Sequence, residues 1–121
     1  KTSVAPLSRR SRLETGKMSK VNEINVKIKD NKVVVYSKTY CPFCTMAKGA
    51  LDDAGLKNYL VIELDEIENG DAYQDALKEI TGGRTVPRVF IGGKFVGGGD
   101  AVKGLQDSGK LKPMLQEAGA L

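Results

Sequence analysis

Hydrophobic residues change their spacing several times along this chain, and the changes predict an ordered series of helices and strands. Residues 33–37 form a short, nearly continuous apolar run, which is typical of a central strand covered on both faces. A stretch with helical spacing follows the run and ends at Gly55, a residue typical of helix C-termini. By the same criteria we expect further helices at 20–29, 71–80 and 101–118, the last interrupted near 108–109, and further strands at 59–64, 88–91 and 94–96.

The order of these segments predicts the class of fold. Gly92 and Gly93 separate the last two strands, and a two-residue glycine connection is typical of a tight hairpin. A helix separates the first two strands, which is the connection that parallel neighbours need. The pattern therefore predicts an α/β sandwich: a four-stranded mixed sheet flanked by helices, with an early parallel unit and a late hairpin.

Composition and charge narrow the class of protein. The 121 residues are 40% hydrophobic and 28% charged, an ordinary balance for one folded domain. No run approaches the ~20 apolar residues of a membrane span. Residues 1–17 lack apolar periodicity and hold five basic residues against one acid, so they account for the whole net charge of +4. We expect this segment to be disordered, as a transit-peptide remnant or an added leader, and the folded domain to cover 18–121. The balanced charge of that domain argues against nucleic-acid binding.

Cys41 and Cys44 are the only two cysteines, and they lie where the first predicted strand gives way to a helix. Free N–H groups and the positive dipole end of a helix favour a thiolate, so a Cys-X-X-Cys pair there predicts a redox site. Inert buried thiols and a structural disulfide are two plainer interpretations, although a disulfide closing so small a loop contributes little stability. A structural zinc site would need four ligands, and the chain has no histidine.

The positions of the two thiols predict different roles. Cys41 should lie at the helix N-terminus as the exposed nucleophile, whereas Cys44, one turn further on, should be shielded and act as the resolving thiol. Pro42 suits the first helical turn because its missing N–H needs no partner there. Since the chain has no histidine, any side-chain charge that stabilises the thiolate should come from Lys38, three residues before Cys41.

Three motifs occur in the order found in glutaredoxins, and they give a specific resemblance to that family over residues 20–118. The stretch 38–44 (KTYCPFC) resembles the glutaredoxin active site, with Phe43 where the family most often has tyrosine. The stretch 85–91 (TVPRVFI) is similar to the family's segment with a cis-proline. The stretch 97–100 (GGGD) resembles its glycine-rich turn before a helix.

The resemblance implies a thioredoxin-like fold and a binding site for glutathione. Val86 would pair with the ligand backbone in strand fashion, and Asp100 would take its ammonium group. Ala101 stands where family members often have a second aspartate, so only its N–H is available to the ligand. The implied glutathione-binding residues are Lys38, Tyr40, Cys41, Gln74, Thr85, Val86, Pro87, Gly98, Gly99, Asp100 and Ala101.

The activity implied by the resemblance is glutathione-dependent reduction of protein–glutathione mixed disulfides and protein disulfides through Cys41, with Cys44 as resolving thiol. We expect glutathione and such proteins as partners, no metal cofactor, no nucleic-acid or membrane partner, and a monomer. The expected location is cytoplasmic, or organellar (chloroplast or mitochondrion) if residues 1–17 are a native transit remnant.

Two alternative functions remain open at this stage. One is a carrier or sensor of a [2Fe–2S] cluster ligated by Cys41 from two chains and by two glutathiones. Pro42 disfavours this alternative because it stiffens the turn after the first cysteine. The other is a substrate of a thioredoxin-type reductase, which the absence of tryptophan beside the cysteines disfavours.

Overall fold

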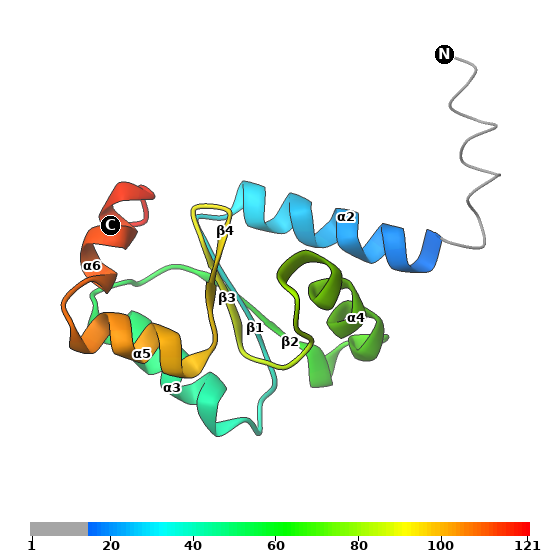
Figure 1. Ribbon diagram of the computed structural model, residues 1–121, viewed down its shortest axis with the longest axis horizontal. Helices are drawn as coiled ribbons and strands as arrows, with labels where there is room; N and C mark the ends of the chain where they lie inside the picture. Colours follow the sequence, from blue (N-terminus) through cyan, green and yellow to red (C-terminus); the bar gives the residue numbers. More distant parts are fainter. Residues whose placement is uncertain (1–14) are drawn as a thin grey trace, which may run out of the picture.

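The computed structural model describes residues 15–121 as a mixed sheet between two layers of helices (Figure 1). The elements in chain order are α2 (Thr15–Asp30), β1 (Val33–Ser37), α3 (Pro42–Asp53), β2 (Leu60–Glu63), the short 3₁₀ helix η2 (Leu64–Glu66), α4 (Gly70–Thr81), β3 (Arg88–Ile91), β4 (Lys94–Gly97), α5 (Gly99–Asp107) and α6 (Leu111–Glu117). The strand order is β2-β1-β3-β4. The predicted four-stranded mixed sheet flanked by helices is confirmed, and the first helix begins earlier than predicted, at Thr15.

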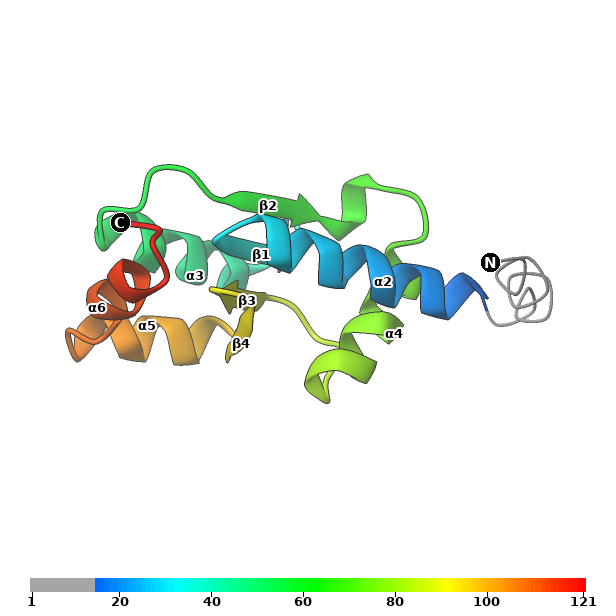
Figure 2. The ribbon, with the colours of Figure 1, turned by 90° about the horizontal axis from the view of Figure 1, so that it is seen from above.

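The first strand lies at the centre of the molecule because both of its faces are covered. All five residues of β1 are buried, as the continuous apolar run predicts. Successive side chains of a strand point to opposite faces. Val33 and Val35 accordingly join the core under α3, α5 and α6, whereas Val34 and Tyr36 join the core under α2 and α4. Figure 2 shows the two groups of helices on opposite sides of the sheet.

Strand pairing brings three distant chain segments to one end of the sheet. β1 pairs with β2 in parallel and with β3 in antiparallel fashion, so the end of β1 lies beside the start of β3, with Tyr36 opposite Arg88. β3 in turn pairs with β4, with Val89 opposite Gly97. The segment after β1, the segment before β3 and the start of α5 therefore meet at the same edge. The predicted hairpin is also confirmed, because Gly92 and Gly93 both have positive φ, at 62° and 83°.

Part of the predicted domain organisation lies outside the described residues. Residues 1–14 are not described, and residues 15–17 are the first residues of α2. The disordered segment 1–17 and the domain boundary at residue 18 stay predictions. Within residues 15–121, no helix is long and apolar enough to cross a membrane.

The N-terminus of α5 packs closely against α3, and Gly99 permits the approach. A Cβ at this position would lie 2.5 Å from the backbone oxygen of Phe43 and 3.1 Å from its Cβ. Gly104, in the same helix, has no such neighbour within 4 Å. The two glycines therefore form a matched pair for testing how the two helices pack.

We expect Gly99→Ala to lower the free energy of unfolding by roughly 1–3 kcal/mol, because the new methyl group forces α5 away from α3. Gly104→Ala should raise it by about 0.5–1 kcal/mol, because alanine restricts the unfolded chain and favours the helix. Urea unfolding followed by circular dichroism measures both changes. Equal effects of the two substitutions would contradict the close packing at Gly99.

Candidate active site

Cys41 is the N-cap residue of α3, and its sulfur takes the place of the usual capping oxygen. The residue has an extended backbone (φ −93°, ψ 115°), and its Sγ accepts a hydrogen bond from the Cys44 N–H at 3.2 Å. Pro42 follows in the first turn, where its missing N–H costs nothing. An N–H group and the positive end of the helix dipole thus both act on this sulfur, and both favour a negative charge there.

Cys44 has the opposite environment, although it lies only one helical turn away. Its side chain is fully buried, whereas that of Cys41 is partly exposed, and both cysteines are free thiols. Burial, followed by the hydrogen bond with Cys41, raises the pKa of Cys44 to about 11. The predicted division into an exposed and a shielded thiol is therefore present in the geometry.

The segment before β3 faces Cys41 across the end of the sheet. The peptide bond between Val86 and Pro87 is cis, as the resemblance implied. The carbonyl oxygen of Val86 accepts a hydrogen bond from the Cys41 thiol at a sulfur–oxygen distance of 3.8 Å. The backbone at Val86 is therefore in direct contact with the sulfur of Cys41.

A cleft of about 470 Å³ lies between this segment and the start of α5. Seven of the predicted glutathione-binding residues line it: Thr85, Val86, Pro87, Gly98, Gly99, Asp100 and Ala101. Two further lining residues, Phe43 and Arg88, were not among the predicted ones. Both could have been predicted from the sequence, because Phe43 directly precedes Cys44 and Arg88 directly follows Pro87.

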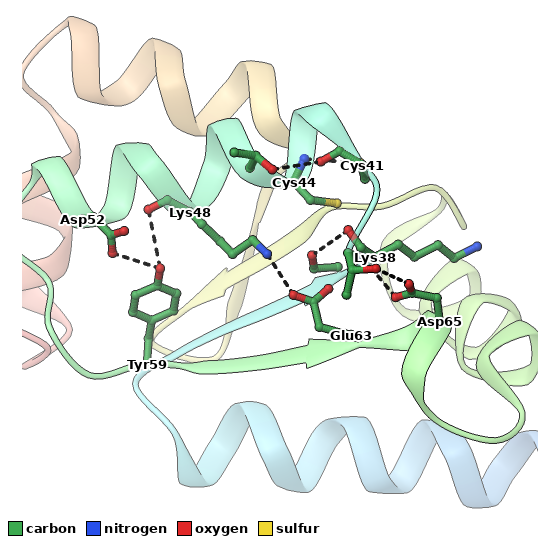
Figure 3. A network of polar contacts seen from close by, with 11 residues as sticks. Lys38, Cys41, Cys44, Lys48, Asp52, Tyr59, Glu63 and Asp65 are labelled. Carbon is green, nitrogen blue, oxygen red and sulfur yellow. Dashed lines mark hydrogen bonds and ion pairs between the residues drawn. The ribbon is translucent and has the colours of Figure 1, made fainter.

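Four predicted ligand-binding residues lie outside the lining of this cleft: Lys38, Tyr40, Cys41 and Gln74. Of these, Cys41 contacts Val86, which lines the cleft. Tyr40 is 70% exposed, and Lys38 extends away from both cysteines on the side of Asp65, as Figure 3 shows. Gln74 is buried, and its side-chain amide donates to the carbonyl oxygen of Arg84 at 2.8 Å. This bond fastens the segment that leads to Thr85, so in the structure Gln74 supports the cleft from within. Binding of glutathione by these residues, and by those that line the cleft, stays a prediction.

Asp65 holds the turn before Cys41 in place, and sequence reasoning missed this contact. Its carboxylate accepts the Thr39 N–H at 2.9 Å and also the Thr39 hydroxyl (Figure 3). These two hydrogen bonds keep the pKa of the Asp65 carboxyl below its usual value, with a smaller contribution from the charge of Lys38. Because the partners are 26 positions apart, no local pattern could have indicated the pair.

The fold and the site together define a class of protein. A partly exposed thiol at a helix N-terminus, a buried thiol one turn later and a cis-proline opposite them constitute a thiol–disulfide active site on a thioredoxin-like fold. The glutaredoxin family model matches residues 33–96, which is more than half of the chain. This chain belongs to the glutaredoxin family, and its class is that of a thiol–disulfide oxidoreductase.

Several relatives and solved structures are similar to this chain over most of its length. A glutaredoxin of Ricinus communis is 51% identical over 104 residues, covering 86% of this chain and 98% of the relative. Mitochondrial glutaredoxin-2 of Pongo abelii is 48% identical over 107 residues, 88% of this chain, which spans only 66% of that protein.

Among solved structures, oxidized glutaredoxin 2 of Chlamydomonas reinhardtii is 54% identical with a TM-score of 0.84, covering 87% of this chain and 98% of that one. A buckwheat glutaredoxin–glutathione complex is 45% identical, also with a TM-score of 0.84, covering 89% and 97%. These similarities confirm the thioredoxin-like fold.

The contrast between the two thiols makes alkylation strongly selective. At pH 8 a thiol whose pKa is about 11 is ionised to roughly one part in a thousand, and only the thiolate reacts. We therefore expect iodoacetamide to modify Cys41 of the folded protein long before it modifies Cys44, so that one group is added per chain. Mass spectrometry of peptides measures this, with the unfolded protein in urea, where both thiols react, as control. Equal modification of Cys44 in the folded protein would contradict its shielding.

Proposed function

We propose that this protein reduces protein–glutathione mixed disulfides and protein disulfides with glutathione as the electron donor. The observation that carries the proposal is the position of the Cys41 sulfur, which is capped by the Cys44 N–H and lies 3.8 Å from the carbonyl oxygen of Val86. A nucleophilic sulfur is thereby held against Val86, one of the residues that line a cleft whose walls suit a peptide with charged ends.

The lining of the cleft supports glutathione as the ligand. The backbone of Val86 is available to pair with the cysteinyl part of the tripeptide as a neighbouring strand would. Gly98 and Gly99 allow a carboxylate to approach the free N–H groups at the start of α5. Asp100 beside them is exposed and suits the ligand's ammonium group. The buckwheat relative, crystallised with glutathione, supports this assignment.

The proposed reaction consists of two thiol–disulfide exchanges. The Cys41 thiolate attacks the glutathione sulfur of the mixed disulfide, the sulfur–sulfur bond breaks, and the substrate protein leaves with the electron pair as a thiolate. A second glutathione thiolate then attacks the glutathione sulfur bound to Cys41, which releases oxidised glutathione and restores the Cys41 thiolate. Alternatively, Cys44 attacks Cys41 and displaces glutathione, which leaves a Cys41–Cys44 disulfide for glutathione to reduce.

Metal binding, protein partners, the monomeric state and location stay predictions. Within residues 15–121 no group of three or more candidate His, Cys, Asp or Glu ligands could hold a metal ion. The cluster alternative would instead draw Cys41 from each of two chains. Pro42 in the first turn of α3 argues against it, as it did in the sequence.

Replacing each cysteine should have a different effect on the rate of deglutathionylation. We expect Cys41→Ser to abolish glutathione-dependent release of glutathione from a mixed-disulfide substrate, because a serine hydroxyl without an activating base does not attack a disulfide near neutral pH. Cys44→Ser should keep much of the activity, because the second glutathione replaces the resolving thiol. The assay couples the oxidised glutathione formed to glutathione reductase. An active Cys41→Ser protein would contradict the proposed mechanism.

Asp100 tests whether the cleft binds glutathione. Asp100→Asn removes the charge proposed to meet the ammonium group, so KM for glutathione should rise roughly five- to tenfold with a smaller change in kcat. Asp107→Asn is the matched control, because Asp107 ends the same helix, is exposed and forms an ion pair with Lys103 on the same helix. Its KM should stay unchanged. If Asp100→Asn leaves KM unchanged, or both variants change it equally, the proposed binding mode is wrong.

A further inference from the structure

Ser37 is a polar residue in a row of buried apolar side chains. Alternation along β1 directs Val33, Val35 and Ser37 to the same face of the sheet, the one that α3 covers. The two valines belong to the core on that face, and Ser37 is 0% exposed like its neighbours. A fully buried hydroxyl requires a hydrogen-bond partner, so its role needs an explanation.

The facing side of α3 supplies the partner. Cys44, Ala47 and Leu51 recur at helical spacing and are all fully buried, so they form the row of α3 that faces the sheet. Cys44 is the first of the row and lies at the end of the sheet where β1 finishes with Ser37. Figure 3 shows the sulfur of Cys44 directed from the helix toward the backbone of Lys38, the next residue along the chain.

The Ser37 hydroxyl and the Lys38 N–H are the two donors on this side of the sheet that favour the thiolate form of Cys44. Burial is the largest influence on the pKa of Cys44 and raises it, whereas these two donors act in the opposite direction. In the structure the Ser37 hydroxyl donates to the Lys38 carbonyl oxygen at 3.4 Å, which is long for a hydrogen bond between oxygens. Because this bond is long and a hydroxyl rotates, the proton can turn from the carbonyl oxygen to the sulfur when Cys44 becomes a thiolate.

We propose that the Ser37 hydroxyl, together with the Lys38 N–H, stabilises the Cys44 thiolate whenever the Cys41–Cys44 disulfide opens or closes. The inference deepens the proposed function, on which it rests, because it concerns only the route through that disulfide. Reduction by glutathione, with Cys44 acting as leaving group, is the step in which this charge develops.

The burial of the two thiols decides which sulfur is attacked. Cys44 is 0% exposed, whereas Cys41 is partly exposed, so an incoming thiolate reaches the Cys41 sulfur. A bond forms between the incoming sulfur and the Cys41 sulfur, and the Cys41–Cys44 bond breaks. Cys44 leaves with the electron pair as a buried thiolate and then takes up a proton from solvent. A charge that develops inside the core depends strongly on the donors around it.

The test compares the opening of the Cys41–Cys44 disulfide in the full chain and in its Ser37→Ala variant. The oxidised protein is mixed with excess 2-mercaptoethanol, quenched with an alkylating agent and analysed by mass spectrometry. This thiol needs no glutathione site, so failure of the inference is distinguishable from failure of the proposed function. We expect opening to slow roughly tenfold in Ser37→Ala, from loss of a hydrogen bond to a charged group. Ser37→Thr, which keeps the hydroxyl, should restore most of the rate.

A second arm separates this role from a merely structural one. In a Cys44→Ser background the disulfide between Cys41 and 2-mercaptoethanol is cleaved by the same thiol, and no charge develops at position 44. Ser37→Ala should change this rate less than twofold. An equal loss of rate in both backgrounds, or no loss in either, would overturn the proposal.

Discussion

The hydrogen bond from the Cys44 N–H to the Cys41 sulfur is the contact on which the site depends. It uses one of the donors that every α-helix leaves free at its N-terminus, and it places a sulfur where the chain would ordinarily place a capping oxygen. Helix formation and activation of the nucleophile are therefore the same event. With no histidine in the chain, this backbone donor and the helix dipole take over work that a side-chain base does in other thiol sites.

That bond is useful only because the sheet delivers the rest of the site to the same place. The antiparallel pairing of β1 with β3 sets Val86 against Cys41, and the pairing of β3 with β4 brings α5 alongside. Gly99 then lets α5 approach α3 closely enough to close one wall of the cleft. The cleft and the Cys41 sulfur are thus positioned by backbone pairing.

The contrast between the two thiols follows from their places on one helix. Cys41 precedes the first turn and meets solvent, whereas Cys44 is in the first turn on the face that packs against the sheet. The same short motif therefore supplies a thiol that solvent and partners can reach and a buried one whose pKa burial raises. Such a difference allows one sulfur to exchange with external partners while the other stays reserved for its neighbour.

The sequence by itself determined the elements and the chemistry. The bounds of strands 33–37 and 88–91, the glycine hairpin and the thiol pair followed from spacing and residue type, because these signals are local. Only the tertiary structure decided which distant groups meet. The bond between Thr39 and Asp65, the inward turn of Gln74 and the burial of Ser37 under α3 all depend on how strands and helices pack. A pattern along the chain gives the face on which a residue lies, whereas the partner across that face is set by register and packing.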